Sequence, residues 1–255
     1  MSHQAVNKLK ATNPLVFNLT NTVSVDFVAN GLLSLGASPI MSEAAEEAED
    51  LLKISQALVV NLGTLNEAFI QRAKIACAYA NSLNVPIILD PVGAGASAYR
   101  TKTAADFLRN YQIALVGNGS EIMALSGDAQ KTKGVDSLAE SLDAENAAIA
   151  LSTEYRCVVT VSGATDVIVS GSQVAHITGG SPMMPNVVGT GCLFTAVTAA
   201  FCATNPDNMY QAAQDAAIYY GECGVFAAEK AEGPGSFRTH FLDALAVVAV
   251  GVAHA

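Results

Sequence analysis

Short apolar segments alternate along this chain with longer segments in which apolar and polar residues are mixed. A short, continuous apolar segment bounded by Gly, Asn or Pro is typical of a strand that is buried on both faces. Four segments have this pattern: 57–62 (ALVVNL), 85–90 (VPIILD), 113–116 (IALV) and 157–161 (CVVTV). Residues 166–170 and 173–177 flank Gly171 and Ser172, which predicts a hairpin.

The longer mixed segments predict helices. Thr64-Leu65-Asn66-Glu67 has the spacing of a capping box, so we predict a helix that begins there and ends near Leu83. Another helix is expected after Ser42, with acidic residues in its first turns. Further helices are predicted near 103–110, at 193–203, at about 208–231 and at about 237–252.

Buried strands separated by helices predict an α/β fold with a mostly parallel central sheet and helices on both faces. The 255 residues contain no linker-like run, so we expect one domain over 1–255. Ligands of such sheets bind beyond the carboxyl ends of the strands. The loops of interest therefore follow Leu62, Asp90, Val116 and Val161, together with the loop that enters the helix at Leu193.

The net charge of −10, with only 13 Lys and Arg, argues against a nucleic-acid-binding or membrane-surface protein. If the ligand is a nucleotide, helix N-termini and a divalent cation must offset much of its charge. No signal-peptide core is present, and the longest mostly apolar stretch, 192–203, is too short to span a bilayer. Five scattered cysteines without a pairing pattern favour the reducing cytoplasm.

The segment 189–192 (GTGC) predicts a phosphate site. Its two glycines let successive N–H groups face one concavity, and the helix that follows adds partial positive charge. That helix has no acidic residue to offset its dipole before Asp207. The alternative is a glycine-rich turn that only lets a buried helix pack closely.

Residues 90–95 (DPVGAG) place an acid at the carboxyl end of a buried strand, which is costly unless the carboxylate is paired, caps a turn or binds a metal. The dinucleotide fingerprint G-x-G-x-x-G fails because residue 98 is Ala, and no P-loop motif exists. Residues 118–121 (NGSE) place Asn118 and Glu121 on one face of a helical turn, where both could face a hydrated Mg²⁺. The alternative is an Asn N-cap with Glu three residues later.

Several segments together resemble the hydroxyethylthiazole kinase family, which has the ribokinase-like fold. The resemblance covers nearly the whole chain, and the joint pattern is more specific than any single segment. The matching segments are 18–21 (NLTN), 28–33 (VANGLL), 37–41 (ASPIM), 61–65 (NLGTL), 90–95 (DPVGAG) and 189–192 (GTGC).

The resemblance implies transfer of a phosphoryl group from ATP to the alcohol of 5-(2-hydroxyethyl)-4-methylthiazole, for thiamine synthesis or salvage. Cys192 stands where related sugar kinases have a catalytic Asp, next to the acceptor hydroxyl. Gly189, Thr190 and Gly191 would form the anion hole at the transferring phosphoryl group. Because helix N-termini lower the pKa of a Cys, partial thiolate character is expected at Cys192.

Further contacts are implied by the same resemblance. They are Met41, Asn21 and Gly189 for the thiazole, Asp90 and Glu121 for Mg²⁺ (directly or through water), and Asn118 and Ser162 for the nucleotide. Two positions depart from the family pattern: Val116 replaces the usual Arg and Ser162 the usual Thr. Two alternatives stay open. One is a ribokinase-like kinase for another small alcohol, against which Cys192 in place of Asp counts, and the other is a nucleotide-binding protein without catalysis, which the missing Arg at Val116 suggests.

The resemblance also implies a homotrimer with each thiazole pocket at a subunit boundary. Val23, Val25, Phe27 and Val28 lie close to the polar segment 18–21. Covering these apolar side chains against a neighbouring subunit would remove apolar area from water. The alternative is that this segment packs against its own subunit.

Overall fold

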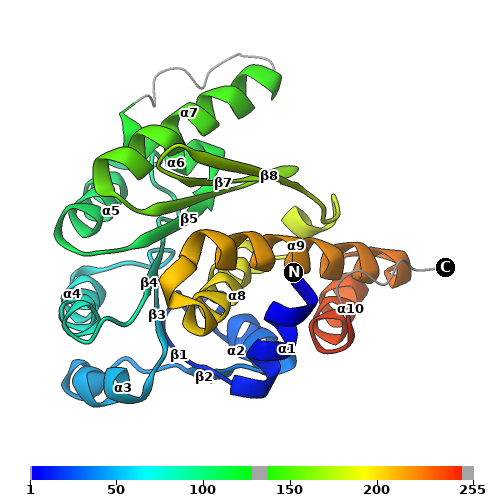
Figure 1. Ribbon diagram of the computed structural model, residues 1–255, viewed down its shortest axis with the longest axis horizontal. Coiled ribbons are helices and arrows are strands. Elements are labelled where there is room, and N and C mark those ends of the chain that lie inside the picture. Colours follow the sequence, from blue (N-terminus) through cyan, green and yellow to red (C-terminus); the bar gives the residue numbers. More distant parts are fainter. Residues whose placement is uncertain (1, 128–136, 249–255) are drawn as a thin grey trace.

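The computed structural model describes residues 2–127 and 137–248, in which the strands form one eight-stranded sheet of order β2-β1-β3-β4-β5-β6-β7-β8 (Figure 1). Pairing is parallel from β2 to β6 and antiparallel for β6-β7-β8. The strands are β1 (Leu15–Leu19), β2 (Ser38–Ile40), β3 (Ala57–Asn61), β4 (Ile87–Asp90), β5 (Ala114–Asn118), β6 (Val158–Ser162), β7 (Thr165–Ser170) and β8 (Gln173–Thr178).

Helices cover both faces of the sheet (Figure 1), and each face has its own apolar core. One layer contains α1 (Ser2–Thr12), α2 (Val25–Leu35), α8 (Thr190–Thr204), α9 (Met209–Lys230) and α10 (Pro234–Val247). The opposite layer contains α3 (Ala48–Ile54), α4 (Glu67–Ser82), α5 (Ala98–Asn110), α6 (Gly119–Ser126) and α7 (Ser137–Tyr155). Because β3 to β6 are buried on both faces, their side chains are apolar without alternation.

The registers bring polar strand ends together at one edge of the sheet. Asn61 pairs with Asp90 across β3 and β4, and Asn118 pairs with Ser162 across β5 and β6. This is the carboxyl edge, where the sequence placed the loops of interest. The four predicted strands and the hairpin are confirmed, with ends that differ by one or two residues.

Some predicted helix ends are wrong. Asn66, not Thr64, is the N-cap of α4, because the Asn66 side chain accepts the N–H of Phe69. The helix after Ser42 begins as a short 3-10 turn at Ala45–Glu47 and becomes α-helical only in α3.

The helix predicted near 103–110 begins earlier, since Ser97 caps the first turn of α5. The last helix also begins earlier than predicted, at Pro234. Its predicted end at residue 252 lies outside the described residues.

The sequence analysis assigned no helix to 25–35, and the structure corrects the interface expectation there. The segment forms the amphipathic helix α2, in which Phe27 and Val28 are buried in the core of their own chain. Val25 is half-buried, and only Val23 is largely exposed, at 68%. Most of this apolar stretch therefore packs within its own subunit.

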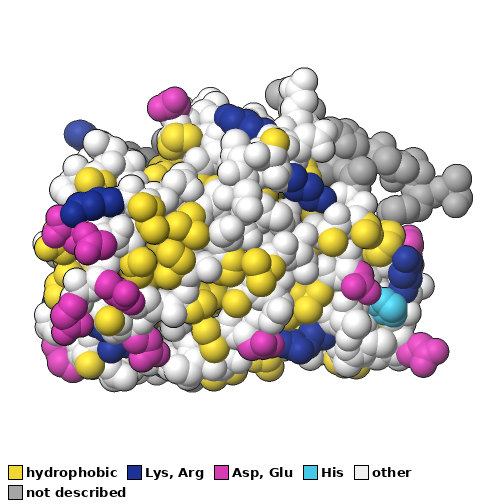
Figure 2. All heavy atoms as spheres, turned by 90° about the horizontal axis from the view of Figure 1, so that it is seen from below, with side chains coloured by type: hydrophobic (Ala, Val, Ile, Leu, Met, Phe, Trp, Pro, Cys, Tyr) yellow, Lys and Arg dark blue, Asp and Glu magenta, His cyan; other side chains and the backbone are white. Residues whose placement is uncertain are grey.

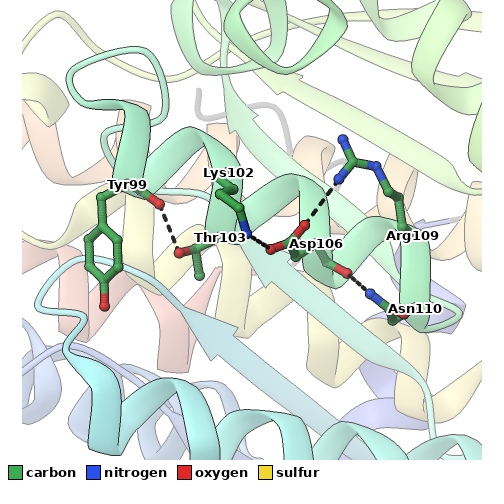
Figure 3. A network of polar contacts seen from close by, with 6 residues as sticks. All are labelled: Tyr99, Lys102, Thr103, Asp106, Arg109 and Asn110. Carbon is green, nitrogen blue, oxygen red and sulfur yellow. Dashed lines mark hydrogen bonds and ion pairs between the residues drawn. The ribbon is translucent and has the colours of Figure 1, made fainter.

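Several basic side chains lie on an outer helix face, where they pair with acids. Figure 3 shows α5, where Lys102 and Arg109 both reach Asp106, with N···O distances of 2.7 and 3.0 Å. Hydrogen bonding to Lys102 lowers the pKa of Asp106. Exposed pairs of this kind contribute little to stability.

Candidate active site

The N-terminus of α8 has the geometry of an anion site. Gly189 is its N-cap, with φ of +94°, a left-handed conformation that glycine adopts without strain. The amide of Leu193 donates to the carbonyl of Gly189, and the amide of Thr190 to that of Val187. Between them, the amides of Gly191 and Cys192 have no acceptor within the described part of the chain. With no acid in the first turn, these amides are available to an anion.

The side chain of Thr190 holds the preceding loop and not a ligand. Its hydroxyl donates to the carbonyls of Met184 and Val187, at 2.8 and 3.1 Å. The carbonyl of Thr190 accepts the hydroxyl of Tyr220 from α9, at 2.6 Å. The first turn of α8 is therefore fixed by both the loop and the neighbouring helix.

A cavity of about 630 Å³ opens beside this turn. It brings together four residues that the sequence analysis singled out separately, namely Asn118, Ser162, Thr190 and Gly191. Its other walls are the β6-β7 turn, the loop 179–185 and the side chains of Phe194 and Tyr220. The volume lies in the usual range for a small-molecule or cofactor pocket.

The lining residues of this cavity include no Lys or Arg. Asp166 provides a carboxylate, whose Oδ1 accepts the N–H of Gly163 at 2.9 Å. Burial raises the pKa of Asp166 to about 6. Val116, where the sequence analysis noted a missing Arg, is 2% exposed and packs in the core. A phosphate here would depend on backbone amides and on a cation from outside these walls.

Next to the cavity, a chain of hydrogen bonds joins Cys192 to Asp90. Asn21 donates through Nδ2 to Cys192 Sγ at 3.2 Å and to Asn61 Oδ1 at 2.8 Å. Asn61 donates through Nδ2 to Asp90 Oδ2 at 2.6 Å. Thr195 donates to the same oxygen at 3.0 Å. Asn21 and Cys192 thus meet within one chain.

The pKa of Cys192 shifts opposite to the expectation from sequence. Burial raises it, and the charge of Asp90 raises it further, whereas hydrogen bonds from Ser24, Asn21 and Asn61 lower it only in part. The neutral thiol is favoured at neutral pH, and the prediction of partial thiolate character is wrong.

Asp90 ends β4, and Glu121 lies in the first turn of α6, which follows the neighbouring parallel strand β5. Burial raises the pKa of Asp90 to about 8, and the charge of Glu121 adds to this. Glu121 accepts the amides of Gly93 and Asn118, at 2.8 and 3.0 Å, while Asn118 caps the amide of Glu121. Asn118 and Glu121 thus form the N-terminal capping box that the sequence offered as the alternative. Burial raises the pKa of Glu121.

The two carboxylates fit a hydrated Mg²⁺, not a dehydrated one. Within residues 2–127 and 137–248, no group of three His, Cys, Asp or Glu side chains could enclose a metal. Mg²⁺ commonly keeps several waters and takes one or two carboxylates. A cation near Asp90 and Glu121 would also offset the repulsion that raises the pKa of Asp90.

Met41 follows β2 and is half-buried against the core on the α8 side of the sheet. It is not among the residues that line the large cavity. The sequence analysis gave no role to Asn61, Thr195 or Tyr220. A signal existed for Asn61, because an amide at the end of an apolar strand must find a partner. Nothing in sequence pointed to Thr195 or Tyr220, which lie inside helices.

Solved structures with low identity share this architecture. A ribokinase-like superfamily protein from Enterococcus faecalis has a TM-score of 0.66 at 14% identity, covering 92% of this chain and 88% of that one. A pyridoxal kinase from Staphylococcus aureus has a TM-score of 0.60 at 15% identity, covering 83% and 88%. The fold is therefore that of the ribokinase-like proteins.

Closer relatives identify the family. The model of the "Hydroxyethylthiazole kinase family" matches residues 6–250. A hydroxyethylthiazole kinase of Brachyspira hyodysenteriae is 47% identical over 94% of this chain and 91% of that protein. The solved hydroxyethylthiazole kinase structure from Pyrococcus horikoshii has a TM-score of 0.88 at 34% identity, covering 96% and 92%. This chain belongs to the hydroxyethylthiazole kinase family and is a kinase.

Within the described residues, no helix is long and apolar enough to cross a membrane. All five cysteines are free, and four are buried, whereas Cys192 is intermediate in exposure.

Proposed function

We propose that this chain transfers the γ-phosphoryl group of ATP to the hydroxyethyl group of 5-(2-hydroxyethyl)-4-methylthiazole, giving the thiazole phosphate used for thiamine. The observation that carries this proposal is that the first turn of α8 contacts both the large cavity and the side chain of Asn21. Thr190 and Gly191 line the large cavity, and the next residue, Cys192, contacts Asn21 on the other side. ATP would occupy the cavity and the thiazole alcohol the side of Cys192, Asn21 and Met41.

Release of ADP with and without the thiazole alcohol tests this function. We expect ADP only when the alcohol is present, and a much lower kcat/KM for sugar or pyrimidine alcohols. Equal turnover of such an alcohol would favour a ribokinase-like kinase with another acceptor. Nucleotide binding without acceptor-dependent ADP release would instead indicate a binding protein.

The mechanism depends mainly on alignment and charge. Phosphoryl transfer has a loose transition state with charge on the equatorial oxygens, so little proton removal must precede bond formation. The anion hole expected at Gly189, Thr190 and Gly191 would bind those oxygens. Its available amides include those of Gly191 and Cys192, whereas the Thr190 amide already donates to the Val187 carbonyl.

A neutral Cys192 thiol next to the acceptor hydroxyl would orient that hydroxyl. The hydroxyl proton would pass late to an oxygen of the transferred phosphoryl group, because a neutral thiol cannot take up a proton. Asp90 and Glu121 would hold Mg²⁺, which supplies positive charge near the phosphates when bound.

Replacement of Cys192 by alanine is expected to lower kcat without unfolding the protein. Loss of a general base costs about 10²–10⁴-fold, and a neutral thiol that only orients the acceptor hydroxyl places the expected loss at or below the lower end of that range. Steady-state kinetics and a thermal melt measure the two effects. Wild-type turnover in Cys192→Ala would show that the thiol only packs against its neighbours.

We also propose a homotrimer in which a neighbour covers the acceptor side of the site. Val23 and Val188, beside Asn21 and Gly189, are 68% and 70% exposed. A Cβ on Gly189 would lie 3.0 Å from that of Ser24, so the two valine-bearing loops adjoin. Figure 2 shows hydrophobic side chains gathered on the face that lies at the bottom of Figure 1.

Sedimentation equilibrium tests the assembly. We expect about three times the 26.3 kDa chain mass, and a 26.3 kDa species at working concentration would contradict the trimer. Because Asn21 and Cys192 share one chain, mixed trimers of their alanine variants are not expected to regain activity.

The proposal also includes a single kinase domain over 1–255 in the cytoplasm, which the single sheet and the five free cysteines support.

A further inference from the structure

We propose that Asn61 is a positioning residue that holds the Cys192 side of the site and the Asp90 carboxylate in one fixed arrangement. Asn61 ends β3 beside Asp90, and its side chain is 1% exposed. The catalytic meaning of this arrangement rests on the proposed function, whereas the arrangement itself follows from hydrogen bonds.

The orientation of the Asn61 amide is set by its neighbours. The backbone N–H of Gly63 donates to Asn61 Oδ1 at 2.9 Å, and Asn21 Nδ2 donates to the same oxygen at 2.8 Å. A backbone N–H can only donate, so the oxygen of Asn61 must face Gly63. Its Nδ2 then faces Asp90 Oδ2, at 2.6 Å. One buried side chain therefore contacts both partners.

The Asn21 amide is oriented in the same way. Its Oδ1 accepts the backbone amides of Val23 and Ser24, at 3.1 and 3.0 Å. The two hydrogens on its Nδ2 are then directed to Asn61 Oδ1 and Cys192 Sγ. Removing the oxygen of Asn61 leaves one hydrogen without its acceptor. The Asn21 side chain would then keep its Oδ1 contacts but lose the acceptor that fixes Nδ2, so its hydrogen bond to the sulfur would be less well placed.

The Asp90 carboxylate has a second support on the helix that carries Cys192. Thr195 lies one turn after Cys192 on α8, is buried, and donates to Asp90 Oδ2 at 3.0 Å. Asn61 and Thr195 thus hold the same oxygen from two elements. Because misplacement by about 1 Å can cost about 10²-fold in rate, loss of either donor affects turnover more than binding.

Alkylation of Cys192 reports on one half of this arrangement without any ligand. Four cysteines are buried, so iodoacetamide labelling followed by mass spectrometry monitors Cys192. In Asn61→Ala we expect labelling to slow about fivefold, because a hydrogen bond that favours the thiolate is lost. We also expect kcat to fall about 10- to 100-fold, with the KM for the thiazole alcohol within about threefold.

A matched pair of variants on α8 isolates the other half. Thr195 and Thr198 are both buried, and the hydroxyl oxygen of each lies within hydrogen-bond distance of the carbonyl four residues earlier, Gly191 at 3.3 Å or Phe194 at 2.9 Å. Only Thr195 also donates to Asp90. We expect Thr195→Val to lower kcat about tenfold with unchanged alkylation, and Thr198→Val to change neither.

Two results would overturn the inference: wild-type alkylation in a folded Asn61→Ala protein, or equal kcat in the two threonine variants. If Asn61→Ala does not fold, Asn61→Ser replaces it, because a serine is too short to reach both Asn21 and Asp90. Failure of the wild type to release ADP with the thiazole alcohol would contradict the proposed function. The alkylation rates, measured without ligands, would still decide the role of Asn61.

Discussion

Phosphoryl transfer by this chain is expected to stop when excess EDTA removes divalent cations, and to return when Mg²⁺ is restored. The reason is the charge of the cavity, whose lining includes no Lys or Arg and one carboxylate, Asp166. The backbone amides of Gly191 and Cys192 cannot offset a triphosphate alone, so a cation must supply the remaining charge. An ADP-release assay titrated with EDTA and then Mg²⁺ measures the effect.

A fold control separates chelation from damage, since the melting temperature without nucleotide should not change with EDTA. Turnover that survives excess EDTA would contradict the proposed Mg²⁺ requirement.

Glu121→Gln should lower kcat and raise the Mg²⁺ concentration for half-maximal activity. An unchanged Mg²⁺ titration in that variant would leave Glu121 only its contacts to Gly93 and Asn118.

Replacement of Gly189 by alanine is expected to lower kcat by about 10²-fold. Gly189 has φ of +94°, and a Cβ there would lie 3.0 Å from Ser24 Cβ and 3.2 Å from the Phe27 ring. Both the strain and the contact would shift the amides of Gly191 and Cys192, which we propose bind the anion. Steady-state kinetics with saturating ATP measures the loss.

Gly127→Ala is the matched control. Gly127 has φ of +89°, and no atom of residues 2–127 or 137–248, its chain neighbours aside, lies within 4 Å of an added Cβ. It therefore carries a similar left-handed strain, of about 1–2 kcal/mol, without the steric contact or the nearby site. We expect both variants to lose stability and only Gly189→Ala to lose turnover. Equal kcat in the two variants would show that the exact placement of the α8 amides does not matter.

Much of the fold was predictable because its signals are local. Apolar strands such as 57–62 and 85–90 need only their own side chains to indicate burial on both faces. Helix α2 was missed because its apolar residues, which alternate with polar ones, were interpreted as part of a subunit interface. The capping error at Thr64 has a similar cause, since both Thr64 and Asn66 are good caps and only the backbone path decided between them.

The sequence by itself determined the parallel sheet, its polar carboxyl edge and the glycine turn before α8, because each follows from residues close together in the chain. Only the tertiary structure decided which polar groups share a site. Asn21 and Cys192, 171 positions apart, meet because α2 and α8 lie on the same face of the sheet. Folding also raises the pKa of the Cys192 thiol, because its burial, which is the largest cause, and the neighbouring Asp90 both follow from long-range packing.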